Sequence, residues 1–340
     1  MGVGYWGPNI LRNLTRLAPE RVRWVCDADA DRLDDIRREY DIRTTTDLSD
    51  LLDDPDTNAL MLALPPQLHH SVALRALEAG KHLFVEKPMA LSLGQVREVV
   101  RVAEERGRLL MVGLTYRYNL AIDQIGAILA SGRVGPVREV YSTRTGLNLR
   151  SKHANVIWAL APHDVSILAH WFGGVPERVR SKTRCVKHSG IEDVAEIEMD
   201  FAGGVSAKIG LSWIDPQKKR HIVVIGARGA VVYDEIAAHD RIDIYSPQAL
   251  RFDWDGESTV AAPRIVGTPE QTYELGMQYE EPLLGECRHF LECLDTGRPP
   301  LTGGRESVEV TKVIQAILTA ANNGPHEIRA ERAANNEWTR

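Results

Sequence analysis

One lysine of this sequence, Lys87, follows an expected strand at a position where α/β proteins can use a lysine for catalysis. The apolar run from His82 to Val85 leads into Lys87 and Pro88. At the carboxyl end of a parallel strand, such a lysine points its ammonium group into the crevice where these sheets bind ligands. The segment Trp158–Asp164 adds His163, whose unperturbed pKa lies near neutrality. An ammonium group and an imidazole can together stabilise a developing oxyanion and move a proton.

A glycine-rich turn at the start of the chain adds a possible phosphate site. Gly2, Gly4 and Gly7, with Tyr5 and Trp6 between them, fit the pattern G-x-G-x-x-G. Such glycines allow a tight turn, and they let backbone N–H groups at a helix N-terminus approach a pyrophosphate. The motif alone is weak, and a plain loop is the competing interpretation.

Asp27 strengthens the case for a dinucleotide. It ends the next expected strand about 20 residues after the last glycine, the spacing of a carboxylate that accepts hydrogen bonds from the adenosine ribose. A carboxylate there repels a 2′-phosphate, so the sequence predicts NAD as the cofactor and makes NADP less favoured. The alternative is that Asp27 only ends a strand or caps a helix.

The elements that would position these residues alternate along residues 1 to about 115. Apolar runs bounded by turn residues predict strands, and the segments between them have helical composition. The alternation indicates βαβ units and a Rossmann-type parallel sheet. The expected strands are Arg23–Cys26, Asn58–Leu64, the run into Lys87, and Leu109–Val112; the expected helices are Asp29–Tyr40, Ser71–Ala79 and Leu93–Arg106.

The first strand of such a sheet is missing from the sequence, because only Met1 precedes Gly2. That strand is normally central, and its loss removes about four buried side chains at roughly 1.5–3 kcal/mol each. It also leaves two neighbouring strands with unpaired edges. We therefore expect the true start to lie upstream; the alternative is a chain that has lost proper cofactor binding.

After about Tyr118 the pattern changes to antiparallel strands. Polar and apolar residues alternate over Val194–Phe201 and Val205–Trp213, with Gly203 and Gly204 between them, which predicts a hairpin. The sequence thus predicts a dinucleotide-binding domain (1–117), a substrate-binding and oligomerisation α+β domain with a large, open, mostly antiparallel sheet (118–324), and a polar tail (325–340). Further expected elements are strands at His221–Ile225, Ala230–Tyr233 and Arg241–Tyr245 and helices at Pro282–Leu294 and Arg305–Ala321.

Composition excludes several classes of function. Of 340 residues, 44% are hydrophobic and 26% charged, and the net charge is −6, which argues against a nucleic-acid partner. No apolar stretch approaches a membrane span, and no export signal is visible, so we expect a cytoplasmic protein. The spacing of Cys26, Cys185, Cys287 and Cys293 favours reduced thiols and predicts no metal site.

With these motifs in hand, the chain resembles the Gfo/Idh/MocA oxidoreductases, and within them the branch that acts on nucleotide-linked sugars. The likeness runs from residue 2 to about residue 322. The resemblance implies a Rossmann domain followed by an α/β domain whose open sheet commonly forms the subunit interface. The matching segments are Gly4–Asn9, Ala63–His69, Glu86–Pro88, Thr115–Asn119, Asn155–Trp158 and Ala161–Asp164.

The resemblance also implies roles. Lys87 would lie near the nicotinamide and the reacting sugar carbon, Glu86 would orient the loop or touch the cofactor, and His163 would hydrogen-bond the reacting hydroxyl. A small-molecule sugar substrate and a homodimer or homotetramer are expected. Further cofactor contacts would come from Leu64, Pro65, His69 and Arg117, and the sugar pocket would include Tyr118, Asn148, Arg150, Asn155 and Trp158.

Two positions depart from the family pattern. Ala159 stands where the family usually has an aspartate four residues before the histidine, and Ser166 replaces another frequent aspartate. The leading hypothesis is an NAD-dependent oxidoreductase that exchanges a hydride with a ring carbon of a nucleotide-linked sugar, as a 3-dehydrogenase or 3-ketoreductase would. Two alternatives stay open: a non-catalytic sugar or dinucleotide sensor, and an epimerase or lyase with recycled NAD.

Overall fold

The computed structural model describes residues 1–147, 155–187, 190–237, 241–246, 269–274 and 280–328. Its first part alternates strands and helices up to residue 113. The strands are β1 (Trp24–Cys26), β2 (Arg43–Thr45), β3 (Ala59–Leu62), β4 (His82–Glu86) and β5 (Leu110–Gly113). The helices are α1 (Gly7–Leu17), α2 (Ala30–Glu39), α3 (Leu48–Asp53), α4 (Pro66–Glu78) and α5 (Leu93–Glu105), with short 3₁₀ turns η1 (Pro19–Arg21) and η2 (Thr115–Tyr118).

Two parallel sheets form in this part, and the first residues of the chain lie between them. β1 pairs with β2, and β3, β4 and β5 pair in that order. Gly2 N–H donates to Cys26 O (2.8 Å), Ala63 N–H donates to Met1 O (2.9 Å), and the Met1 amino group donates to Met61 O (2.6 Å). Residues 1 and 2 therefore bridge β1 and β3 at their carboxyl ends.

Behind Met1 the two sheets are separated by a groove of about 360 Å³. Its walls include the residues of β3, the β1 residues Trp24 and Val25, and apolar side chains of α1 such as Ile10 and Leu14. Within the described ranges, no strand pairs with the edges of β1 and β3 that face this groove. The unpaired edges expected from the sequence are thus present in the fold.

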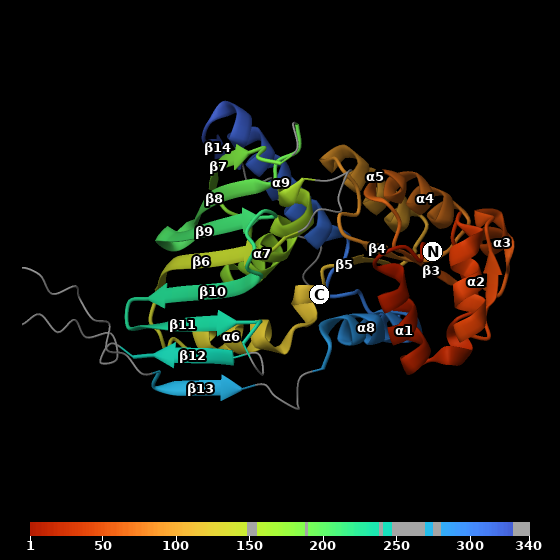
Figure 1. The fold of residues 1–340 in the computed structure, drawn as a ribbon, viewed down its shortest axis with the longest axis horizontal. Coiled ribbons are helices and arrows are strands. Elements are labelled where there is room, and N and C mark those ends of the chain that lie inside the picture. Colours follow the sequence, from red (N-terminus) through yellow and green to blue (C-terminus); the bar gives the residue numbers. More distant parts are fainter. Residues whose placement is uncertain (148–154, 188–189, 238–240, 247–268, 275–279, 329–340) are drawn as a thin grey trace, which may run out of the picture.

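The second part is built on one nine-stranded sheet, in the order β13-β12-β11-β10-β6-β9-β8-β7-β14. β6 and β9 run parallel, and the other neighbours are antiparallel. Its strands are β6 (Val137–Thr145), β7 (Arg178–Arg184), β8 (Val194–Phe201), β9 (Val205–Ser212), β10 (Lys219–Gly226), β11 (Gly229–Asp234), β12 (Arg241–Tyr245), β13 (Gln271–Glu274) and β14 (His326–Glu327). Helices α6 (Leu120–Ala130), α7 (Val156–Phe172) and α9 (Gly304–Asn323) lie along one face of this sheet (Figure 1).

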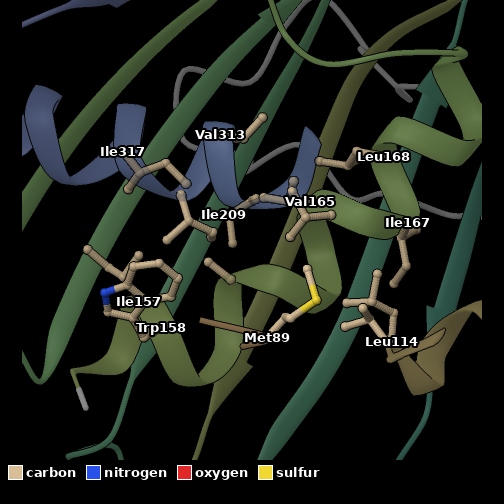
Figure 2. Close-up of a cluster of buried hydrophobic side chains, with 14 of the residues drawn as sticks. Met89, Leu114, Ile157, Trp158, Val165, Ile167, Leu168, Ile209, Val313 and Ile317 are labelled. Carbon is tan, nitrogen blue, oxygen red and sulfur yellow. The ribbon is translucent and has the colours of Figure 1, made fainter. Parts of the chain in front are cut away.

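The two parts are joined by helices as well as by the chain. α9 packs against α5 of the first part and against α7 of the second. α8 (Pro282–Thr296) packs against α1 and η2. Figure 2 shows the core that results, where buried side chains of α7, α9 and β9 meet Met89 and Leu114 from the ends of the parallel strands. The crevice at the ends of those strands therefore rests on packed side chains from both parts.

The predicted fold class is confirmed: parallel Rossmann-type strands precede a large, mostly antiparallel sheet. The expected β8–β9 hairpin is present with Gly203 in its turn, at a φ of 77° that favours glycine. Several elements were not expected, namely α3, α6, α7, β2, β6, β7 and β13. α7 escaped prediction because Pro162 interrupts its interior, where proline normally breaks a helix.

The chain's last described residues differ from the expected polar tail. His326 and Glu327 form β14 and pair with Val179 and Arg178 of β7, and Ile328 is buried. The rest of that segment lies outside the described residues. In the described part of the chain, no helix combines the length and apolar character that a membrane span needs.

Candidate active site

A cavity of about 490 Å³ opens between the carboxyl end of β4, the glycine turn and α7. Walls from both parts of the fold enclose it, so its chemistry draws on residues far apart in sequence. It is lined by Tyr5, Trp6, Ala63, Leu64, Pro66, Glu86, Lys87, Thr115, Tyr116, Asn119, Arg144, Leu160, His163, Arg220, Glu235, Glu281, Pro282 and Leu283.

Lys87 directly follows β4 and projects into this cavity. Its Nζ donates to the backbone oxygen of Ala159 on α7 (2.9 Å), which fixes the ammonium group across the cavity from its own strand. Burial lowers the pKa of Lys87, the neighbouring Glu86 opposes that change, and Arg144 adds to it. A lysine with a lowered pKa can stabilise an alkoxide and exchange its proton more readily than an exposed one.

Glu86 lies beneath Lys87 and connects it to the glycine turn. Its Oε1 accepts from the indole nitrogen of Trp6 (2.6 Å), and its Oε2 accepts from the Lys87 backbone N–H (3.2 Å). A Cβ at Gly113 would lie 2.9 Å from the Glu86 carboxyl carbon, so glycine is needed there to make room. Burial raises the pKa of the Glu86 carboxyl to about 7, while Lys87 and Trp6 oppose the shift.

His163 faces the same cavity from α7. Its ring packs against that of Tyr116, with ring centres 4.8 Å apart. Burial lowers the pKa of His163 well below the usual value, and the charges of Lys87, Arg144 and Arg220 lower it further. The imidazole is therefore neutral at neutral pH and can accept a proton.

A buried ion-pair network supports this histidine. The guanidinium Nε of Arg144 on β6 donates to both carboxylate oxygens of Asp164 (2.8 and 2.9 Å), and Ser142 Oγ donates to Asp164 Oδ1 (2.7 Å). The guanidinium group also lies 4.1 Å from the Tyr116 ring centre, and Tyr116 donates to Glu235 (2.6 Å). Tyr116 thus contacts both the Arg144 guanidinium group and the His163 ring.

The glycine turn has the shape of a phosphate-binding loop. Gly2 adopts a φ of 79°, and a Cβ at Gly7 would lie 1.8 Å from the Gly2 oxygen, so the turn closes only with glycine at these positions. α1 begins at Gly7, and no side chain caps its first turn. The amide groups there suit an anion. Gly4 lies close to the Arg32 side chain (3.5 Å from an added Cβ).

Asp27 organises this turn from the end of β1. Its Oδ2 accepts from Val3 N–H (2.7 Å) and its Oδ1 from Asp29 N–H (2.9 Å), with the Arg32 guanidinium 3.7 Å from Oδ1. The turn, the uncapped helix and the cavity beyond them fit a dinucleotide.

Comparison with known proteins identifies the family. A model described as "Oxidoreductase family, NAD-binding Rossmann fold" matches residues 1–114, and the "GFO/IDH/MocA C-terminal domain" matches residues 122–232. An uncharacterised oxidoreductase of Bacillus subtilis, YrbE, is 30% identical and covers 82% of this chain and 94% of its own length. The chain belongs to the Gfo/Idh/MocA oxidoreductases.

Two further family relatives indicate the range of functions. D-apiose dehydrogenase of Paraburkholderia graminis is 24% identical over 95% of this chain and 87% of its own length. The WlbA dehydrogenase of Bordetella pertussis, in a complex with NADH and UDP-GlcNAcA, has a TM-score of 0.80 at 21% identity and covers 97% of this chain and 98% of its own. The first shows a sequence relationship, and the second shows the shared Gfo/Idh/MocA fold.

The structure brings one group of the expected Gfo/Idh/MocA site residues together. Tyr5, Trp6, Leu64, Glu86, Lys87 and His163 all line the cavity. Pro65 lies next to it, directly before α4. His69 and Arg117 are buried outside the cavity lining; His69 Nδ1 hydrogen-bonds to Pro88 O (2.7 Å), so it supports the lysine loop from below.

Other residues expected in the sugar pocket lie elsewhere. Tyr118 turns toward the β5 side, where its hydroxyl meets Thr302 Oγ1 (3.0 Å), and Asn155 caps α7 by accepting from Trp158 N–H (3.0 Å). Trp158 is 9% exposed and packs in the core shown in Figure 2. Asn155 and Trp158 take these positions because helix α7 begins at Val156. Asn148 and Arg150 lie outside the described residues.

Sequence reasoning missed Arg144, Arg220 and Glu235, which come from β6, β10 and the end of β11. Of these three residues, only Arg144 could have been predicted from the sequence. It occupies an inward-facing position of a strand with alternating residues, and a buried arginine needs a carboxylate partner. Asp164, directly after the predicted His163, is that partner. In the described part of the chain, no group of three or more potential metal ligands occurs.

Asp27→Asn is expected to weaken NADH binding about 10-fold, corresponding to about 1.4 kcal/mol. The carboxylate that would hold the ribose is lost, and with it a negative charge that repels a 2′-phosphate, while Arg32 keeps its ion pair with Asp29, so the preference for NADH over NADPH should narrow. Tryptophan quenching with each cofactor measures both effects. Asp47→Asn, at another helix cap, is the control. If Asp27→Asn had the same preference for NADH over NADPH as wild type, Asp27 would not take part in cofactor selection.

Glu86→Gln should change how stability depends on pH. The raised pKa of Glu86 means that the unfolded chain releases this proton at about pH 4.5, whereas the folded chain retains it up to about pH 7. Wild-type folding therefore loses about 2–4 kcal/mol from this group as pH rises through that window. The variant should gain stability relative to wild type over the same interval, measured by urea unfolding, with the exposed Glu104→Gln as control. If the stability of wild type and of Glu86→Gln changed with pH in the same way, the raised pKa of Glu86 would be contradicted.

Proposed function

We propose that this oxidoreductase exchanges a hydride between NAD and a ring carbon of a sugar, and that the sugar is nucleotide-linked, as in a 3-dehydrogenase or 3-ketoreductase. The observation that carries the proposal is that Lys87 and His163 line one cavity together with Tyr5 and Trp6 of the glycine turn. The nicotinamide, when bound, accepts or supplies the hydride.

The residues divide the remaining work. In the oxidative direction a bound NAD would take the hydride from the sugar carbon, and the neutral imidazole of His163 would take the hydroxyl proton. The Lys87 ammonium group stabilises the oxyanion that develops during this transfer, and Glu86 favours the charged form of that lysine. In the reductive direction the proton returns from His163 to the oxygen.

Two observations support a nucleotide-linked substrate. Arg220 lies in the cavity wall, and a guanidinium group there suits a diphosphate. WlbA, which shares the fold, has UDP-GlcNAcA in its complex. Homodimers or homotetramers, a cytoplasmic location and a preference for NAD over NADP complete the proposal.

The test is a screen of keto-sugars, both free and nucleotide-linked, with NADH oxidation followed by absorbance. Oxidation with a nucleotide-linked keto-sugar supports the proposal in full, and oxidation with free keto-sugars only would overturn the nucleotide part. A sugar that binds tightly without any hydride exchange would favour a sensor. Product formation without net change in NADH would favour recycled NAD.

A further inference from the structure

The carboxylate side chains that line the candidate cavity differ in how many of their oxygens the protein itself occupies. Both oxygens of Glu86 and both oxygens of Glu281 accept hydrogen bonds. Glu235 accepts through Oε2 alone, from the hydroxyl group of Tyr116 (2.6 Å). Within the described ranges, no group donates a hydrogen bond to its Oε1. This oxygen is therefore available to a ligand in the cavity.

Glu235 is held in place by the strands around it. It directly follows β11, and its backbone N–H donates to the Arg220 oxygen of β10 (3.0 Å). The Arg144 guanidinium group lies 3.8 Å from Oε2, the oxygen that also accepts from Tyr116. These contacts orient the carboxylate without covering it, because 27% of the Glu235 side chain stays exposed. An acceptor fixed in this way loses little freedom when a ligand binds.

Tyr116 spans the interval between this acceptor and His163. Its ring packs against the imidazole with ring centres 4.8 Å apart, and the hydroxyl group at its other end bonds to Glu235. A pyranose ring is about as wide as a tyrosine ring. A sugar whose reacting hydroxyl lies at His163 can therefore bring a hydroxyl on another ring carbon to Glu235.

Ala159 cannot supply such an acceptor. Its side chain packs against the hydrophobic core, and the residue lies outside the cavity lining. Its backbone oxygen already accepts from the Lys87 ammonium group (2.9 Å). The missing carboxylate at residue 159 thus leaves Glu235 as the cavity carboxylate with a free oxygen among the described residues.

We propose that Glu235 is a substrate-binding residue whose Oε1 accepts a hydrogen bond from a sugar hydroxyl that does not react. Glu235 thereby selects substrates that carry a hydroxyl at that ring position, since hydrogen bonds to an ionised acceptor are stronger than those between neutral groups. The assignment rests on the proposed sugar substrate, but it does not depend on hydride exchange.

Calorimetric titration of NADH-saturated protein with UDP-glucose and with each of its monodeoxyglucose analogues tests the proposal. Glu235→Gln keeps an acceptor for Tyr116 and removes the charge, so it should weaken UDP-glucose binding about 10-fold. One analogue lacks the hydroxyl that meets Glu235. Wild type should bind that analogue about 10-fold more weakly than UDP-glucose, and Glu235→Gln should bind it as wild type does, because the two changes remove the same contact.

Glu139→Gln is the matched control, because the Glu139 carboxylate pairs with Lys208 and lies outside the cavity lining. It should bind UDP-glucose and every analogue as wild type does. Glucose and its monodeoxy analogues, titrated in the same way, cover a site that takes free sugars. Affinity for NADH should be the same in all three proteins.

The outcomes separate recognition of one hydroxyl from a structural role. If Glu235→Gln weakened UDP-glucose and all analogues by the same factor, Glu235 would only shape the cavity, and the proposal would be overturned. Unchanged affinity in the variant, or a wild type that binds neither UDP-glucose nor glucose, would overturn it as well. The titrations need no turnover, so a lack of hydride exchange with this binding pattern intact would contradict the proposed function alone.

Discussion

Replacing Lys87 with alanine is expected to reduce turnover about 10³-fold while NADH binding persists. The Lys87 side chain lines the candidate cavity, and removing a donor that stabilises a developing oxyanion commonly costs 10²–10³-fold in rate. The cofactor's phosphates would be held by the glycine turn and α1, which Lys87 does not touch. Steady-state rates on the keto-sugar found in the screen, together with an NADH titration, measure both quantities.

Two controls sharpen the Lys87 experiment. Lys208→Ala removes an exposed lysine on the large sheet and should leave both quantities unchanged. Lys87→Arg retains a positive charge that cannot give up its proton, so it should recover part of the rate if charge stabilisation dominates and almost none if proton exchange does. Retained turnover in Lys87→Ala would remove this lysine from the mechanism.

A designed extension of the chain should raise its stability substantially. Five apolar, β-branched residues placed before Met1 would run through the groove between β1 and β3, beside Met61, Leu60 and Ala59 in turn. Burial of each side chain contributes about 1.5–3 kcal/mol, against about 1–2 kcal/mol for ordering each residue's backbone. The extension also replaces the Met1 amino group, whose pKa is lowered by burial, with a neutral amide.

The net gain should be about 3 kcal/mol, or about 4 °C in Tm for a chain of 340 residues, measured by thermal unfolding. An extension of the same length made of glycine and serine provides the control, because it can cross the groove but cannot fill it. NADH affinity should rise with the apolar extension as well, since residues 1 and 2 lead directly into the glycine turn. Equal Tm values for both extended proteins would show that the groove does not accept a strand.

Local patterns were enough to predict the strand that leads into Lys87 and the glycine turn. Lys87 follows a continuous apolar run, and the structure places that run on β4, paired on both edges and fully covered. The hairpin of β8 and β9 could also be predicted, because strict alternation of polar and apolar residues indicates a strand with one buried face. In each case the signal lies within about ten residues of sequence.

The rest of the site depends on distant pairing that no local pattern contains. Arg144 and Asp164 lie on different elements, and their contact follows from how α7 packs on β6. Trp158 and Asn155 were expected in the pocket, but the structure places them outside the cavity lining for a related reason. Their segment forms helix α7, which directs Trp158 into the protein core and leaves Asn155 as the cap of the helix.

The joining of the two parts by α8 and α9 has a consequence for the kinetics of the enzyme. Because α9 packs on α5 and on α7 at once, and α8 packs on α1, a rigid-body rotation of one part against the other would break packed helix contacts on two sides. Large hinge closure is therefore disfavoured. Substrate entry and product release should instead follow local movements at the cavity mouth, such as rotation of the exposed Tyr5 side chain, and should respond to solvent viscosity less than in enzymes that close whole domains.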